Sequence, residues 1–291
     1  MRSEIATIKY VRKYTMVPVP DVLAYDADED GAVGGEWMIM EFVDGVPLDE
    51  VWRGMSNRNR YQVALSIAGC LARLIELRFS HIGSLYEDEG GFRVGAMTFL
   101  PSKNVFHTGA PVETQCGPFD SPKDWLLATA RRRLEFTSKR ELTQAQRARM
   151  NQVISDLLSD PALKLCGSSR MSAIALEHVD LGPSNILVDP ANPDRVLAII
   201  DWEGARTVPL WAIQPHPFGH LNKEEVSPKQ KCALQHIIRH AIASQVPQWL
   251  FATGDEGRSF RVLLQMARKG TAPFDEEDFE SRDQILRGLK V

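Results

Sequence analysis

The amino-acid sequence predicts an α+β protein with a small N-terminal part that contains strands and a large C-terminal part that is mostly helical. Residues 1–45 carry one helical pattern followed by two short strand patterns, whereas long helical periodicities dominate residues 46–291. Apolar residues make up 44% of the chain and charged residues 25%, which is ordinary for a globular protein with a substantial core. We therefore expect a domain boundary near residue 45.

The first element is expected to be a helix over residues 3–13. Ser3 is a residue type that caps helices, so we place it at the start of this helix. Ile5, Ile8 and Val11 recur at helical spacing and mark one apolar face. That face is predicted to be buried.

Two short strands are expected next, at residues 21–25 and 36–43, joined by an acidic loop that contains glycine. Residues 44–47 (Asp-Gly-Val-Pro) are interpreted as a turn or linker, because glycine and proline interrupt regular elements. The strands and their loop are predicted to form a hairpin.

The remaining elements follow from apolar periodicity and from breaks at glycine and proline. Helices are expected over 60–79, 124–136 and 143–158, a hairpin over 83–94, extended runs over 173–188 and a buried strand over 196–200. From residue 224 the chain is predicted to be helical again, with breaks at Pro247 and at the pair Gly254 and Gly257.

Charge and cysteine usage exclude several classes of protein. The formal net charge of -4 indicates no excess of positive charge that would attract nucleic acid or an anionic membrane. The four cysteines are far apart, which argues against a zinc site or a disulfide framework and fits a reducing compartment. No apolar run approaches the length of a membrane span. The sequence therefore predicts a cytoplasmic location, with no nucleic-acid or membrane partner.

The segment that carries chemistry runs from Glu177 to Asp189 and continues after a hairpin turn. It holds His178 and Asp180 in a His-x-Asp pattern, with Asn185 five residues after the aspartate. The predicted strand 196–200 then leads directly into Asp201. We expect a short, partly extended loop to present Asp180 and Asn185 toward one cleft, and the returning strand to bring Asp201 to the same cleft.

This combination of side chains suits phosphoryl transfer to a hydroxyl. Such a reaction needs a carboxylate that orients the acceptor hydroxyl and takes its proton, and oxygen ligands that hold magnesium on the phosphates. Asp180 suits the first task as catalytic base, and Asn185 and Asp201 suit the second as metal ligands. Each residue by itself also fits a purely structural role, as a turn residue, an amide cap and a strand-end cap. Their combination favours the catalytic interpretation.

Four other motifs are interpreted as structural. The acidic run at residues 26–31 imitates a calcium loop but lacks its twelfth-position glutamate, so a hairpin tip is expected. His236 and His240 have the spacing of a zinc pair, without the accompanying glutamate or a third ligand. Residues 131–133, three arginines, are expected to form a solvated helix face. The acidic residues 275–278 are expected to stabilise the start of a helix, although a cationic substrate would suit them too.

Taken with these motifs, the chain resembles the aminoglycoside phosphotransferase family, the kinase-fold group that includes choline- and homoserine-kinase-like enzymes. The resemblance covers nearly the whole chain. Its specific part is the segment from Glu177 to Asp189, called the catalytic loop below, together with residues 199–203, called the Asp201 segment. It implies a protein-kinase-like fold of two lobes, ATP and Mg²⁺ as cofactors, and ATP-dependent phosphorylation of a hydroxyl on a small molecule. Residues 40–48 resemble the hinge between the lobes, where backbone groups near Glu41 and Val43 would contact adenine. The helix over residues 3–13 resembles the one that bears the family's ion-pairing glutamate, here Glu4.

The chain departs from the family at its N-terminal lobe. In this family a glycine-rich strand pair and a strand lysine lie upstream of the helix that carries Glu4. Here the first glycine is Gly31 and the first lysine is Lys9, so we expect a truncated N-terminal lobe, exposed apolar surface there and weak ATP binding by residues 1–291. The alternative function is a catalytically silent binding or regulatory protein, or a fragment of an enzyme. The acceptor and the oligomeric state are left open.

Overall fold

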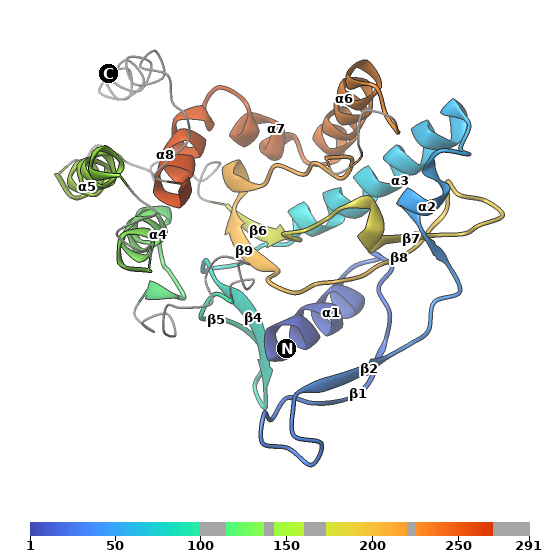
Figure 1. The fold of residues 1–291 in the computed structure, drawn as a ribbon, viewed down its shortest axis with the longest axis horizontal. Coiled ribbons are helices and arrows are strands. Elements are labelled where there is room, and N and C mark those ends of the chain that lie inside the picture. The colour runs from blue at the N-terminus through green and yellow to red at the C-terminus, as the bar shows by residue number, and fades with distance from the viewer. Residues whose placement is uncertain (99–114, 137–142, 160–172, 220, 222–224, 270–291) are drawn as a thin grey trace.

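The fold places a small group of N-terminal elements against a larger helical part. The computed structural model describes residues 1–98, 115–136, 143–159, 173–219, 221 and 225–269. Figure 1 shows the first helix and the first two strands on one side of the molecule, with most of the helices on the other and short strand pairs between them. The mixed helix and sheet content confirms the predicted α+β class. The division of the chain at residue 45 stays a prediction.

Helix α1 (Arg2–Tyr14) is the first element and covers the predicted range. Its face formed by Ile5, Ile8 and Val11 is buried, as the apolar spacing predicts. The predicted cap at Ser3 is wrong, because the helix begins one residue earlier and no side-chain hydrogen bond caps it. Ser3 instead lies buried within the first turn, where its carbonyl accepts a hydrogen bond from the Thr7 hydroxyl at 2.7 Å.

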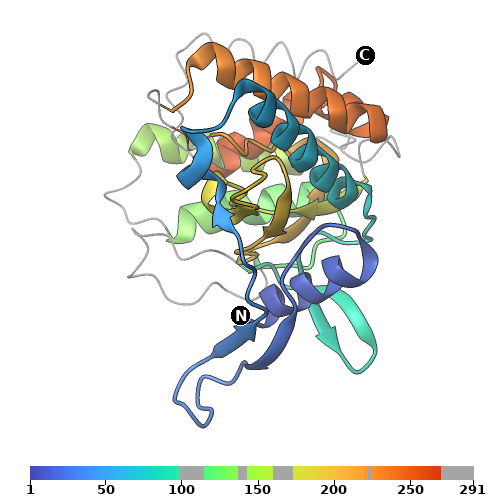
Figure 2. The same cartoon turned by 90° about the vertical axis from the view of Figure 1, so that its right-hand side faces the viewer.

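Strands β1 (Val22–Asp26) and β2 (Trp37–Met40) form the predicted antiparallel hairpin. At the end of β1 the Asp26 carboxylate accepts the backbone N–H of Asp28 at 3.0 Å. A carboxylate of this loop therefore stabilises the turn by accepting a hydrogen bond from a nearby backbone N–H group. This confirms the expected hairpin tip. Figure 2 shows the hairpin projecting from the helical part.

The predicted apolar surface of this N-terminal part is present. The exposed apolar residues there include Met16 at 82%, Leu23 at 64%, Ile39 at 54% and Phe42 at 87% exposure. They lie on the β1–β2 hairpin and on the segments beside it.

Strand β3 (Val46–Pro47) corrects the interpretation of residues 44–47 as a turn or linker alone. Its two residues pair antiparallel with Leu187 and Val188, more than a hundred residues later in the chain. Local sequence carries no sign of that partner. Helix α2 (Leu48–Trp52) follows at once and buries Trp52, whose indole donates to the Glu225 carbonyl at 3.2 Å.

Helix α3 (Asn57–Glu76) is the predicted long helix, and it begins three residues before the expected start. Ser56 explains the difference, because its hydroxyl accepts the backbone N–H of Asn59 at 3.1 Å and caps the helix. The apolar face of α3 packs against α6 (Pro228–Gln245).

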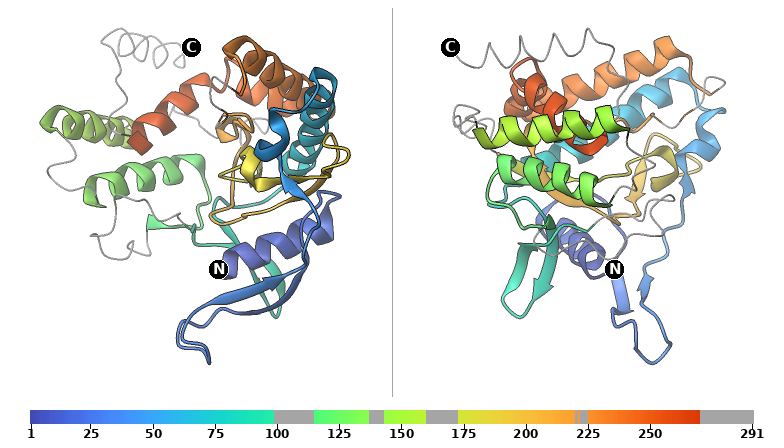
Figure 3. Two further views of the ribbon diagram at one scale, coloured as in Figure 1. Left: turned by 45° about the vertical axis from the view of Figure 1, so that its right-hand side comes forward. Right: turned by 60° about the vertical axis from the view of Figure 1, so that its left-hand side comes forward.

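The other predicted elements are present with small shifts at their ends. The hairpin is formed by β4 (Ser84–Asp88) and β5 (Gly91–Gly95), and the helices are α4 (Pro122–Phe136), α5 (Gln144–Ser159), α7 (Pro247–Thr253) and α8 (Arg258–Lys269). Pro247 separates α6 from α7, as predicted, and the glycine pair lies between α7 and α8. The β4–β5 hairpin packs against α1, and Figure 3 shows the two together. Helix α8 packs against α4.

Two antiparallel strand pairs frame the segment that carries chemistry. Strand β6 (Ile174–Glu177) pairs with β9 (Arg206–Pro209), and β7 (Ile186–Val188) pairs with β8 (Val196–Ile199). One-turn helices η2 (Pro183–Asn185) and η3 (Leu210–Ala212) follow the catalytic loop and β9. Among the described helices, none is both long enough and apolar enough to cross a membrane.

Candidate active site

His178 ties the catalytic loop to the segment that carries Asp201. Its Nε2 donates a hydrogen bond to the carbonyl of Ile200 at 3.0 Å. Its ring meets Trp202 edge to face, with the ring centroids 4.7 Å apart. Both side chains are buried. His178, two residues before Asp180, therefore contacts both Ile200 and Trp202, the residues that flank Asp201.

The imidazole of His178 is suited to structure rather than to proton transfer. Burial is the main cause that lowers its pKa, against the raising effects of the Ile200 hydrogen bond and of nearby carboxylates. Nε2 carries the proton that bonds Ile200, so Nδ1 is an acceptor, and it has no hydrogen-bond partner within the described residues. This environment suits a packing and hydrogen-bonding role that supports the loop.

Asn185 lies at the end of η2 and joins three parts of the site. Its side-chain Nδ2 donates to the Asp180 carbonyl at 2.8 Å, and its backbone N–H donates to Gly182 at 3.0 Å. Its own carbonyl accepts the N–H of Ile200 at 3.0 Å. Because Nδ2 points to the loop, the amide Oδ1 is left to accept from another group or to bind a cation.

Asp201 has a left-handed backbone, with φ of 60°, and its side chain is exposed. Such a φ costs an L-residue other than glycine roughly 1–2 kcal/mol. The neighbouring Trp202 is fully buried, and its indole donates to the Ile199 carbonyl at 2.9 Å. The buried indole holds the chain in a tight turn that turns the Asp201 carboxylate out toward solvent.

Glu4 reaches the same region from α1. Burial is the main cause that raises its pKa, and the carboxylates of Glu203 and Asp201 raise it further, while the N-terminal ammonium lowers it. The N-terminal and helical parts meet here through the backbone too, since Ile199 N–H donates to Pro18 at 2.9 Å. The structure thus brings Glu4 to the side of the Asp201 segment.

Glu41 and Val43 lie in the connection between β2 and β3, apart from the catalytic loop in sequence. The Glu41 N–H donates to Asp21 at 2.8 Å, and the Val43 carbonyl accepts the N–H of Gly45 at 2.8 Å. The opposite groups, the Glu41 carbonyl and the Val43 N–H, make no hydrogen bond within the described part of the chain. An acceptor and a donor are therefore available two residues apart.

A pocket of about 160 Å³ beside Asp180 was not anticipated from the sequence. Its walls come from α3, from the catalytic loop and from the segment after η3, and Glu177, Gln214 and His216 add polar groups. Residues 214–216 follow η3 with no recognisable motif, so sequence carried no signal for them. Only the packing of the segment against α3 and the loop places them next to Asp180.

Metal-binding groups are sparse elsewhere in the described residues. No set of three or more His, Cys, Asp or Glu is placed to hold a metal there. The proposed ligands Asn185 and Asp201 include only one residue of these four types, so they do not form such a set. His236 and His240 meet edge to face on α6, with ring centroids 5.6 Å apart. The acidic residues 275–278 lie outside the described residues.

Comparison with known proteins identifies the family. Residues 1–212 match the model of the phosphotransferase enzyme family, which is most of the chain and includes Glu4, Asp180, Asn185 and Asp201. The chain belongs to this family. The resemblance to aminoglycoside phosphotransferases drawn from the catalytic loop is thereby confirmed.

Two curated fungal relatives resemble this phosphotransferase-family protein over most of its length. A subtelomeric hrmA-associated cluster protein of Aspergillus fumigatus is 24% identical over 269 residues, covering 74% of this chain and 52% of the relative. The altered inheritance of mitochondria protein 9, mitochondrial, of Komagataella phaffii is 27% identical over 253 residues, covering 72% and 41%. The chain spans about half the length of these relatives or less.

Among solved structures, a thermostable mutant of aminoglycoside phosphotransferase APH(4)-Ia in its apo form is similar to this phosphotransferase-family protein. The two share 15% identity with a TM-score of 0.49, over 99% of this chain and 82% of that one.

Proposed function

We propose that this protein transfers the terminal phosphoryl group of ATP to a hydroxyl of a small molecule. One observation supports this above the others. The side chain of Asn185 and the backbone of Ile200 connect Asp180 to Asp201 through two hydrogen bonds of 2.8 and 3.0 Å. These bonds therefore hold the catalytic loop next to the segment that carries the second aspartate.

Asp180 is the proposed catalytic base. Its side chain is exposed and borders the pocket beside α3, so an acceptor can approach it. A carboxylate in this position orients the acceptor hydroxyl and receives its proton as the new O–P bond forms.

Asn185 and Asp201 are the proposed magnesium ligands. Both offer oxygen, the ligand atom that Mg²⁺ prefers, and both are oriented by the backbone contacts described above. One amide and one carboxylate fit a metal that takes its other ligands from water and phosphate. When bound, magnesium supplies neutralisation of the charge on the phosphates.

Adenine binding is assigned to the connection between β2 and β3. The Glu41 carbonyl is an acceptor and the Val43 N–H is a donor, which is the pair of groups that the edge of adenine requires. Glu4 would act beside the phosphates, since it lies near Asp201 and Glu203. Its negative charge calls for a cationic partner there.

Calorimetric titration of the protein with an ATP analogue, with and without magnesium, tests the proposal. We expect magnesium to strengthen binding to the wild type, and Asp201→Ala to weaken this dependence more than Asn185→Ala, because only the carboxylate neutralises charge. Asp194→Ala, in the turn of the same β7–β8 hairpin, is the matched control and is expected to bind as the wild type does.

The absence of nucleotide binding under all conditions would contradict the proposal. It would favour the alternative of a catalytically silent binding protein of the same fold.

A further inference from the structure

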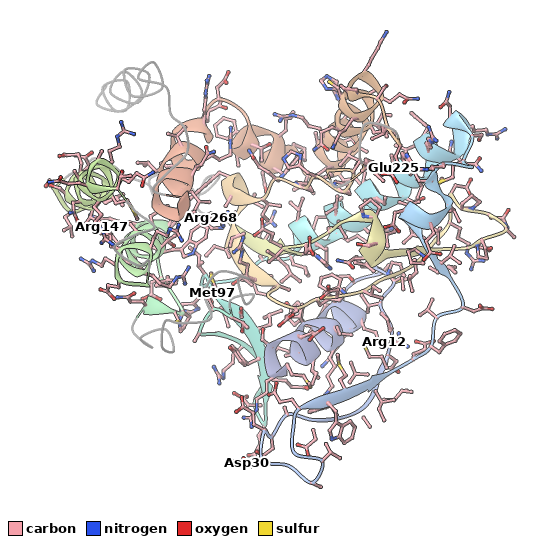
Figure 4. All side chains as sticks on the ribbon, in the orientation of Figure 1. Arg12, Asp30, Met97, Arg147, Glu225 and Arg268 are labelled. Atoms are coloured by element: carbon pink, nitrogen blue, oxygen red, sulfur yellow. The ribbon has the colours of Figure 1, made fainter. Side chains whose placement is uncertain are left out.

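The segment that follows η3 is held in place through its backbone carbonyl groups. The indole of Trp249 on α7 donates to the Ile213 carbonyl at 3.2 Å. The side-chain amide of Gln235 on α6 donates to the Pro215 carbonyl at 2.7 Å, and the His216 carbonyl accepts a backbone N–H at 2.7 Å. Helix α7 packs against η3, and the two lie side by side in Figure 4. These contacts fix the backbone of the segment.

Two side chains of this segment face the pocket beside Asp180. Gln214 and His216 both line that pocket, and both are exposed. Neither side chain has a hydrogen-bond or ion-pair partner within the described part of the chain. An amide has two N–H donors and an acceptor oxygen, and a neutral imidazole has one donor and one acceptor. The two residues can therefore offer these groups to a molecule in the pocket.

The wall of the pocket that α3 supplies is apolar. Leu71, Leu74 and Ile75 form it, and all three are buried. Helix α3 packs against β6, so this wall lies beside the strand that leads into the catalytic loop. Carbon atoms of a ligand that cover these side chains are removed from water, which is favourable. The pocket thus suits a molecule with both a carbon face and polar groups.

Size limits what the pocket can hold. Its volume of about 160 Å³ is close to the roughly 150 Å³ of an engineered cavity in another protein that binds benzene. The pocket therefore has room for one six-membered ring.

Charge limits the ligand further. Among the described residues that line the pocket there is no lysine or arginine, so a carboxylate or phosphate would find no cation. Of the two carboxylates that line it, Glu177 is paired with Arg206, whose Nε donates to it at 2.7 Å. Asp180 is needed for the reacting hydroxyl, so an ammonium group would compete with that hydroxyl for the same carboxylate. An uncharged ligand has neither difficulty.

We propose that Gln214 and His216 determine acceptor specificity, by binding the hydroxyl groups next to the one that Asp180 activates. The part of the acceptor that enters the pocket is then an uncharged ring with neighbouring hydroxyls, whose carbon face packs on α3. This rests on the proposed function and specifies its substrate class.

A purely superficial role for these two residues makes a different prediction. If Gln214 and His216 only meet solvent, their replacement by leucine leaves the binding of any small molecule unchanged. His236 on α6 is exposed as well and does not line the pocket. His236→Leu is therefore a matched control for the loss of an exposed imidazole.

The test is a titration of the full chain without nucleotide, using three probes that share a six-membered ring. They are cis-1,2-cyclohexanediol, which is uncharged, cyclohexanecarboxylate, which is an anion, and cyclohexylammonium, which is a cation. The NMR signal of the His216 ring, identified by its absence from His216→Leu, reports contact in the wild type. We expect a saturable shift of this signal with the diol and weaker binding of both charged probes.

Calorimetry on the variants measures the contribution of each side chain. Gln214→Leu and His216→Leu are each expected to weaken diol binding by about threefold to tenfold, because each removes hydrogen bonds to the diol. His216→Gln keeps a donor and an acceptor, so it should lose less than His216→Leu. His236→Leu is expected to bind the diol as the wild type does.

Three results would overturn the proposal: no saturable binding of the diol to the folded wild type, equal affinity in the wild type and both pocket leucine variants, or tighter binding of a charged probe. Asp201→Ala separates this proposal from the previous one. It is expected to lose the magnesium dependence of nucleotide binding and to keep its affinity for the diol. Diol binding by a protein that binds no nucleotide would contradict the proposed phosphoryl transfer alone.

Discussion

The side-chain amide of Asn185 donates a hydrogen bond to the backbone carbonyl of Asp180 at 2.8 Å. This bond fixes the curvature of the loop between the proposed base and the proposed metal ligand. It also engages the amide nitrogen, whereas the amide oxygen accepts no hydrogen bond within the part of the chain that the structure describes. Asn185 therefore acts on the loop and on the cation site at once.

Replacing Asn185 by alanine is expected to affect both functions. Without the amide, the Asp180 carbonyl loses a donor and the site loses one oxygen ligand. We expect phosphoryl transfer to fall by about tenfold or more, since a hydrogen bond of this kind contributes about 1 kcal/mol and the ligand adds to it. Steady-state kinetics at varied magnesium measures this. Asn192→Ala, in the turn of the β7–β8 hairpin, is the control, and an equal loss there would contradict a specific role.

Asp180→Asn is expected to separate chemistry from binding. The amide has nearly the shape of the carboxylate but cannot take a proton, so turnover should fall by about 10²–10⁴. Nucleotide affinity should stay close to that of the wild type, because Asp180 is not a proposed nucleotide ligand. Single-turnover rates and calorimetry on the same preparation check both statements. Near-normal turnover would remove Asp180 from the mechanism.

The left-handed backbone of Asp201 predicts a difference between two variants that both lack the carboxylate. Glycine adopts φ of 60° without strain, whereas alanine does not. Asp201→Gly should therefore unfold with a free energy about 1 kcal/mol higher than that of Asp201→Ala. Chemical denaturation of the two variants measures it. If the alanine variant is as stable as the glycine variant, the turn around Asp201 is not strained in solution.

His178 predicts how stability changes with pH. Its pKa is lower in the folded protein than its ordinary value of 6.5, mainly because it is buried. The unfolded chain therefore binds the proton more readily, and the folded state loses free energy of unfolding as the pH falls below 6.5. The contribution is fully present above that pH.

Denaturation curves at several pH values for the wild type and His178→Gln test this prediction. The variant is expected to be less stable at neutral pH, because it loses contacts with Ile200 and Trp202. Its stability should fall less steeply between pH 7 and the acid range. Parallel curves for the two proteins would mean that His178 does not take up a proton on unfolding.

Local patterns were sufficient to predict the longer helices and to select the segment that carries the candidate site residues. The apolar spacing of Ile5, Ile8 and Val11 predicted which face of α1 is buried, and the order of His178, Asp180 and Asn185 predicted the loop. Such features depend on residues that are close in the chain, where helical periodicity and a short hairpin fix the geometry.

Other features depended on partners that are distant in sequence. Val46 and Pro47 form a strand only because β7 lies beside them, and Asp201 takes its left-handed backbone only where Trp202 is buried. Arg132 was expected to lie on a solvated helix face, but its side chain is half-buried on α4, which packs against α8. Sequence by itself determined which residues we propose for phosphoryl transfer: Asp180, Asn185 and Asp201. The tertiary structure decided which residues line the pocket beside Asp180, because helices and strands far apart in the chain meet only when their apolar faces are buried together.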